Sequence, residues 1–147
     1  MSEIIIRPAT AADHPALVRI WRSAVDATHD FLAEADRDAI ESRLASDYFP
    51  AVTLVLAEGE DSPIGFAGAL NGNLEMLFVD AARRGAGIGT LLLEHAIAHL
   101  AVTRVDVNEQ NPSAAAFYAR RGFEVIGRSE LDDAGRPYPL LHLRLRG

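Results

Sequence analysis

A glycine-rich segment at residues 84–89, Arg-Gly-Ala-Gly-Ile-Gly, has the residue types and spacing of an anion-binding loop. An apolar run at 74–79 precedes it, and a run with helical character at 90–100 follows it. A strand that turns through glycines into a helix leaves several backbone N–H groups unpaired at one point, where they can bind a phosphate or pyrophosphate. Glycine permits positive φ and close approach of a ligand to the backbone. Arg84 adds a positive charge at the mouth of this loop.

Two other phosphate-binding patterns fit this segment poorly. A P-loop has the pattern Gly-x-x-x-x-Gly-Lys-Ser/Thr, and the chain contains no lysine. The dinucleotide-binding pattern is Gly-x-Gly-x-x-Gly, but here the third glycine comes one residue early and Thr90 stands in its place. These departures weaken a nucleotide-binding interpretation. A glycine-rich turn that binds no ligand remains an alternative, because short motifs also occur without function.

A second motif lies at residues 108–123, about twenty residues after the glycine loop, and reads Asn-Glu-Gln-Asn-Pro-Ser-Ala-Ala-Ala-Phe-Tyr-Ala-Arg-Arg-Gly-Phe. Asn111 before a proline is typical of a helix N-cap, and Gly122 is typical of a left-handed cap at a helix end. Tyr118 in this helix offers a phenol that can give a proton to a leaving group. The alternative is that Phe117 and Tyr118 only pack against the core.

The elements that must position these motifs follow from hydrophobic periodicity and turn signals. Helices are predicted after Asp13 as N-cap, at 34–47, at 90–100 and after Asn111, and strands at 3–7, 52–58, 64–70, 74–79, 102–108, 123–128 and 141–146. The order β-α-α-β-β-β-α-β-α-β-β predicts one α/β (α+β) domain over residues 1–147, with a mixed sheet of about seven strands and helices on both faces. The inward-facing helix residues are expected to be Leu17, Ile20, Trp21, Val25, Ile40, Leu44, Ile88, Leu91, Leu92, Ala96 and Leu100.

Composition narrows the classes of function. The 147 residues carry a net charge of −7, which disfavours nucleic acid as a partner and mildly favours a cationic acceptor such as an amine. The chain contains no cysteine, which excludes an acyl-cysteine intermediate and a thiolate metal site. His95 and His99 are four residues apart, but no third ligand is placed to complete a metal site. With no apolar run of membrane-spanning length and no signal peptide, we expect a cytoplasmic protein without a membrane partner.

Together the two motifs resemble those of the GCN5-related N-acetyltransferase (GNAT) superfamily. The resemblance rests on Arg-x-x-Gly-x-Gly before a helix and on Asn-x-x-Ala-x-x-Phe-Tyr-x-x-x-Gly-Phe after it. Segments 22–32, 108–111 and 127–141 are similar to the bacterial YjaB-type acetyltransferases within that superfamily. The loop departs from the usual pattern at Ala81, where proline is common, and at Ala86, where lysine or another polar residue is common. Neither change removes a backbone donor.

The resemblance implies acetyl-CoA as co-substrate, bound without a metal between splayed strands at 74–79 and 102–108. The pyrophosphate would lie on the amides of the loop, and the pantetheine arm would pair with the strand edge, with the Val79 amide acting as an oxyanion donor. Asn111 would contact the pantetheine arm, although its role as N-cap alone explains it equally well. The expected cofactor-binding residues are Leu77, Phe78, Val79, Arg84, Gly85, Ala86, Gly87, Ile88, Gly89, Thr90, Asn111 and Phe117.

The resemblance also implies catalytic roles. Tyr118 would lie beside the CoA sulfur and protonate the leaving thiolate. Glu75 is the first candidate for the general base, because simple alternation puts it on the strand face of Leu77 and Val79; a base acting through water is an alternative. His29, near the expected acceptor pocket, is the second candidate, and a polar loop histidine is its alternative. Tyr138 is a further candidate for lining that pocket.

The sequence therefore predicts an acetyl-CoA-dependent N-acetyltransferase that transfers the acetyl group directly to a primary amine in a ternary complex. The amine is a protein lysine or a small amine, and a homodimer is left open. The alternative is a non-catalytic acyl-CoA sensor or regulatory protein on the same fold. Tyr118 argues against that alternative, since a protein that only binds has no need of an acid.

Overall fold

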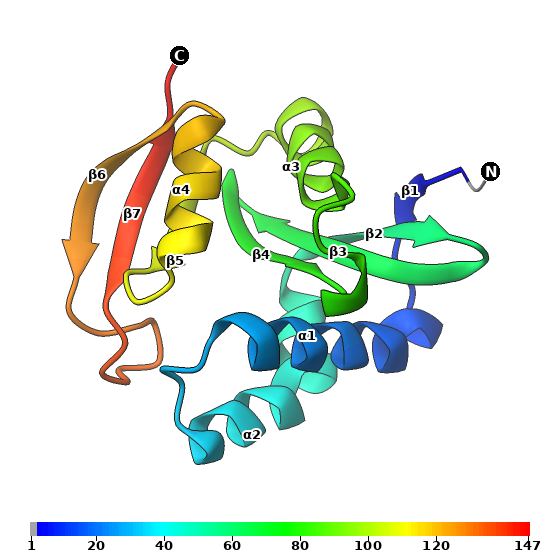
Figure 1. Ribbon diagram of the computed structural model, residues 1–147, viewed down its shortest axis with the longest axis horizontal. Coiled ribbons are helices and arrows are strands. Elements are labelled where there is room, and N and C mark those ends of the chain that lie inside the picture. The colour runs from blue at the N-terminus through cyan, green and yellow to red at the C-terminus, as the bar shows by residue number, and fades with distance from the viewer. Residues whose placement is uncertain (1–2) are drawn as a thin grey trace.

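The computed structural model describes residues 3–147, and its elements follow the predicted order (Figure 1). The helices are α1 (His14–Thr28), α2 (Glu34–Arg43), α3 (Ile88–His99) and α4 (Pro112–Arg120). The strands are β1 (Ile5–Pro8), β2 (Thr53–Gly59), β3 (Ser62–Leu70), β4 (Asn73–Val79), β5 (Arg104–Asn108), β6 (Phe123–Ser129) and β7 (Leu140–Leu145). The helix predicted at 34–47 is shorter than expected: it leaves the α-helical path after Arg43 and continues as one π-helical turn, Leu44–Tyr48. None of the helices in the described residues is long and apolar enough to cross a membrane.

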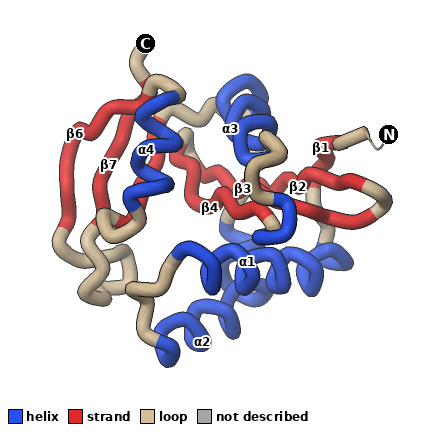
Figure 2. Tube along the Cα trace, viewed as in Figure 1, coloured by secondary structure: helices blue, strands red, loops and turns tan. Residues whose placement is uncertain are grey.

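Within residues 3–147 the strands form a seven-stranded mixed sheet in the order β1-β2-β3-β4-β5-β7-β6 (Figure 2). β2, β3 and β4 form an antiparallel meander, because two-residue turns with positive φ at both positions join β2 to β3 (Glu60, Asp61) and β3 to β4 (Asn71, Gly72). β1 pairs antiparallel with β2, although α1 and α2 lie between them in the chain. β4 and β5 are parallel, and β7 lies between β5 and β6. The predicted fold class is confirmed.

Buried side chains of the described residues form two clusters, one on each face of the sheet. α1 packs one cluster with Leu17, Ile20, Trp21 and Val25, as predicted. α3 packs the other, but one predicted position is wrong: Leu91 is 40% exposed, whereas Leu93 is 1% exposed. α3 meets the sheet through residues 88, 92, 93 and 96, which leaves position 91 at the flank of the apolar stripe.

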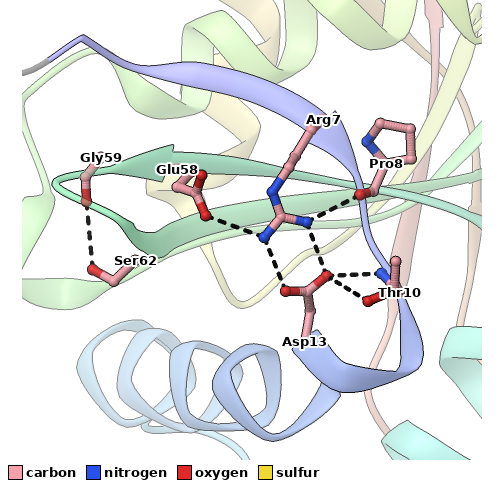
Figure 3. Close-up of polar contacts among 7 residues, drawn as sticks. All are labelled: Arg7, Pro8, Thr10, Asp13, Glu58, Gly59 and Ser62. Atoms are coloured by element: carbon pink, nitrogen blue, oxygen red, sulfur yellow. Dashed lines mark hydrogen bonds and ion pairs between the residues drawn. The ribbon is translucent and has the colours of Figure 1, made fainter.

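An arginine on β1 ties the start of α1 to the sheet (Figure 3). Arg7 donates to both carboxylate oxygens of Asp13 at 3.0 Å and to Glu58 of β2 at 3.1 Å, and Asp13 also accepts from the Thr10 amide at 2.8 Å. The Arg7 guanidinium holds the pKa of Asp13 well below its usual range. Asp13 precedes α1 as predicted, but its carboxylate bonds backward to Arg7 and Thr10 and does not cap the helix amides.

Candidate active site

A cleft opens where β4 and β5 separate. The two strands pair only at Asn73 with Arg104 and at Leu74 with Val105 among the residues described, and then diverge. The divergence leaves a cavity of about 330 Å³, walled by β4, β5, α4, the start of α3 and the end of α1. Of the residues expected at the site, the cavity is lined by His29, Glu75, Leu77, Phe78, Val79, Arg84, Gly89, Asn111, Phe117 and Tyr118.

The glycine loop presents free backbone donors beside this cleft. Gly85 and Gly87 have φ of 83° and 80°, and Gly87 is the residue from which α3 begins. A Cβ at either position would meet no atom within 4 Å, so positive φ, and not crowding, is what favours glycine here. Within residues 3–147, none of the backbone N–H groups of residues 85–90 has a hydrogen-bond partner. An array of unpaired donors at a helix start fits a pyrophosphate.

Arg121 fastens the end of α4 to the start of α3. Its guanidinium donates to Thr90 Oγ1 at 2.6 and 3.2 Å and to the Phe117 carbonyl at 2.9 Å, and it lies 3.8 Å from the centre of the Phe117 ring. Arg121 is not among the residues that the sequence predicted for the site. The sequence signal for this contact is the pair of arginines at 120–121, directly before Gly122. Neighbouring residues do not show which helix the Arg121 side chain would reach.

Tyr118 is buried in the cleft wall, with its ring edge-on to Phe117 and Phe123 at 5.1 and 5.6 Å. Its hydroxyl has no hydrogen-bond partner in the described part of the chain. Burial raises the pKa of this phenol well above its ordinary value, because the phenolate would be poorly solvated. The hydroxyl therefore keeps its proton and is free to donate it to a group in the cleft.

Asn111 is the buried polar residue of the cleft wall. Its Oδ1 accepts from the Ala114 amide at 3.2 Å, which confirms the predicted N-cap of α4. The side-chain Nδ2 group has no hydrogen bond within residues 3–147. The cap thus uses only one end of the amide and leaves the other for a ligand in the cleft.

Glu75 reaches the cleft through a β-bulge. Opposite Gly68 and Ala69 the register passes from Met76 to Leu74, so Glu75 is an extra residue between them. Simple alternation along β4 would put Leu74 on the face opposite Leu77 and Val79. Because Glu75 is an extra residue, Leu74 instead packs in the same cluster as Leu77 and Val79. The Glu75 carboxylate accepts from Asn73 at 2.7 Å, and partial desolvation raises its pKa, with smaller contributions from nearby acidic residues.

His29 also lines the cleft and comes directly after α1. The Thr28 hydroxyl donates its proton to the Ala24 carbonyl at 2.7 Å, so toward His29 Nδ1, also 2.7 Å away, it acts as the acceptor. This arrangement puts the ring proton on Nδ1 and leaves the lone pair on Nε2. Burial lowers the pKa of His29. An unprotonated imidazole in a cleft can act as a base.

Tyr138 joins two loops next to the cleft. Its hydroxyl donates to the Asp36 carboxylate and accepts from the Ala33 amide at 3.0 Å, and its ring contacts Phe31 at 6.1 Å. These contacts tie the connection between α1 and α2 to the connection between β6 and β7. Tyr138 does not line the cavity described above, and its contacts hold these two connections together.

Comparisons with known proteins find similar sequences and similar structures. The model of the acetyltransferase (GNAT) domain family matches residues 22–138. The chain is 45% identical over 141 residues to the peptidyl-lysine N-acetyltransferase YjaB of Salmonella typhimurium, covering 95% of this chain and 97% of that protein. The solution structure of apo-form YjaB from Escherichia coli superimposes with a TM-score of 0.89 at 43% identity and 99% coverage of both chains. A complex of the PaiA N-acetyltransferase from Thermoplasma acidophilum with coenzyme A shares the fold, with a TM-score of 0.74 at 18% identity and coverage of 97% and 99%.

Proposed function

Since the chain belongs to the GNAT acetyltransferase family and is an N-acetyltransferase, we propose that it transfers the acetyl group of acetyl-CoA to the side-chain amine of a protein lysine. The observation that carries this proposal is the cleft itself. One cavity holds a proton donor without a partner, Tyr118, and two bases, Glu75 and His29, beside a row of unpaired loop amides. A relative that is similar over its whole length is a peptidyl-lysine N-acetyltransferase, which supports lysine as the acceptor.

Acetyl-CoA would enter between β4 and β5. The loop amides of residues 85–90 and the charge of Arg84 would bind the pyrophosphate. The edge of β4 from Leu77 to Val79 faces the gap left by β5 and would pair with the pantetheine arm as a neighbouring strand does. The Val79 amide would stabilise the oxyanion that forms on the thioester carbonyl, and Asn111 Nδ2 would donate to the arm. Phe78 and Phe117 line the cavity and would shape its walls, whereas the Ile88 side chain is buried in the core, contrary to its expected place in the site.

The transfer needs one base and one acid. Glu75 would take a proton from the lysine ammonium, and the neutral amine would attack the thioester carbon. The C–N bond forms first and gives the tetrahedral oxyanion. When the C–S bond then breaks, Tyr118 would give its proton to the departing thiolate, and the nitrogen would lose its second proton to the Tyr118 phenolate, which restores the phenol. The raised pKa of Tyr118 suits this role, because the phenol stays protonated until a thiolate forms. His29, unprotonated through its lowered pKa, is the second candidate for the base.

A non-catalytic acyl-CoA sensor on the same fold is the rival. It would need the loop and the strand edge but not an unpartnered acid in the cleft. Tyr118 therefore favours catalysis.

The test is release of CoA thiol from acetyl-CoA with a lysine peptide as acceptor. The matched peptide with arginine in place of lysine, a small polyamine and a lysine-free peptide with a free α-amine are compared at equal concentration. The chain has neither cysteine nor lysine, so it adds no thiol background and has no lysine to acetylate. We expect release with the lysine peptide alone, with one acetyl group on lysine by mass spectrometry. Release only with the polyamine would overturn lysine as acceptor, and acetyl-CoA binding without release for any amine would favour the sensor.

A further inference from the structure

Three side chains with the chemistry of a nucleophilic site have no role in the acetyl transfer proposed above. Asp106 of β5, His142 of β7 and Ser129 of β6 come from three adjacent strands at the edge of the sheet (Figure 1). His142 Nδ1 lies 2.6 Å from Asp106 Oδ1, and His142 Nε2 lies 2.6 Å from Ser129 Oγ. Each contact is within hydrogen-bond distance, so the three groups form one continuous array.

A β-bulge puts Ser129 on the same face as the histidine. Asp106 and His142 are directly opposite in the β5–β7 pairing and so share a face. Between β6 and β7 the register shifts after Val125, so that Gly127, and not residue 126, lies opposite His142. Ser129 is two residues further along and points the same way. Without the extra residue it would point to the face that α4 covers.

The donors and acceptors can be ordered in only one way for a neutral imidazole. A carboxylate accepts but does not donate, so His142 Nδ1 must carry the ring proton. Nε2 then holds the lone pair, and the Ser129 hydroxyl donates to it. This is the order in which serine hydrolases arrange aspartate, histidine and serine, where the imidazole accepts the serine proton as the hydroxyl attacks.

The site is open to a substrate. The His142 and Asp106 side chains are 33% and 28% exposed, and Ser129 is partly exposed. The backbone N–H of Glu130 has no hydrogen bond within residues 3–147. It follows the serine directly, as an oxyanion donor does in many hydrolases. Asp106 also lines the acetyl-transfer cleft, whereas Ser129 and His142 do not.

We propose that Ser129, His142 and Asp106 form a second catalytic centre that hydrolyses small carboxylic esters. Ser129 Oγ attacks the ester carbonyl, and its proton passes to His142 Nε2. The ester C–O bond breaks, and the alcohol leaves with that proton, so that an acyl-serine remains. Water then attacks the acyl carbon and gives a proton to His142 Nε2, which returns it to Ser129 as the carboxylic acid leaves. Asp106 keeps the proton on Nδ1 and stabilises the imidazolium.

Two measurements on the full chain test the proposal, both without CoA. A fluorophosphonate labels activated serines covalently, and peptide mass spectrometry locates the label. Hydrolysis of p-nitrophenyl acetate gives the rate. We expect the label on Ser129 in the unaltered protein and not in His142→Asn. The rate should fall about 100-fold in Ser129→Ala, the range of a lost general base or nucleophile.

Two controls separate this centre from the cleft. Ser42 is an exposed serine whose hydroxyl donates to the Ala39 carbonyl, so Ser42→Ala should keep both label and rate. Tyr118→Phe should also keep them, since the ester site does not depend on the proposed acetyl transfer. Retained acetyl-CoA thiol release in Ser129→Ala shows that this variant folds. No label on Ser129 in the unaltered protein, or an unchanged rate in Ser129→Ala, overturns the proposal.

Discussion

Leu74 lies opposite Val105 in the pair at which β4 and β5 stop pairing within the described residues. In most parallel sheets such pairing continues, and the backbone groups of both strands are satisfied. Here the separation frees the β4 edge from Leu77 to Val79 and opens the cleft that Tyr118 lines from α4. The proposed cofactor binding and the proposed catalysis both depend on this strand divergence.

Tyr118→Phe removes the proposed acid. We expect kcat for thiol release to fall about 100-fold, the lower range for loss of general acid catalysis. The KM for acetyl-CoA should change little. The hydroxyl makes no hydrogen bond in residues 3–147, so thermal stability should also stay close to that of the unaltered protein. An unchanged kcat would remove Tyr118 from the mechanism.

The pH profile of kcat/KM distinguishes the two candidate bases. Glu75 acts only when deprotonated, and its pKa is raised above the ordinary 4.5. Activity should therefore fall as pH falls through that raised value. Glu75→Gln should abolish this acid limb and lower kcat/KM about 100-fold at neutral pH. If the limb persists in Glu75→Gln and disappears in His29→Gln, the base is His29.

Gly87→Ala tests the loop as a pyrophosphate site. Gly87 and Gly135 both have positive φ, 80° and 78°, and neither has an atom within 4 Å of the position that a Cβ would take. Alanine should strain the backbone equally at both and cost about 1 kcal/mol of stability. Only Gly87→Ala should raise the KM for acetyl-CoA, because Gly135 lies between β6 and β7, away from the loop. Equal KM values in the two variants would count against the loop as the binding site.

Asp13→Asn tests the tie between β1 and α1. The free energy of unfolding of the variant should be about 1 kcal/mol lower at neutral pH. This value is modest for hydrogen bonds between charged groups, because the Arg7 side chain is 34% exposed and water weakens the interaction. The pKa of Asp13 in the folded state is lowered from 3.8. Its contribution to stability is therefore complete above the pKa of the unfolded state and is lost as pH falls through the pKa of the folded state.

Urea unfolding between pH 2 and pH 7 measures the difference in free energy of unfolding between Asp13→Asn and the unaltered protein. Asp47→Asn, which breaks the exposed Arg43–Asp47 pair, is the control and should change stability little. A difference that grows toward acid pH would contradict the assignment.

Local rules account for the parts of the fold that were predicted correctly. Positive φ at Gly85, Gly87 and Gly122, and the cap formed by Asn111, follow from the conformations that these residues favour. The element order followed from periodicity and turn residues, since each helix or strand spans only neighbouring positions. The GNAT resemblance arose from the same two segments. The sequence by itself therefore determined the family, the order of elements and the residues of the loop.

The tertiary structure decided what depends on contacts between distant segments. The bulge at Glu75, the exposure of Leu91 and the bond from Arg121 to Thr90 each require knowing which element lies alongside. The array of Asp106, His142 and Ser129 depends on a register shift between two strands that no local pattern marks. Register and strand divergence are set by packing across the whole sheet, and a one-residue shift turns a side chain to the opposite face. For that reason the residue types were visible in the sequence, but the sites that they form were visible only in the folded chain.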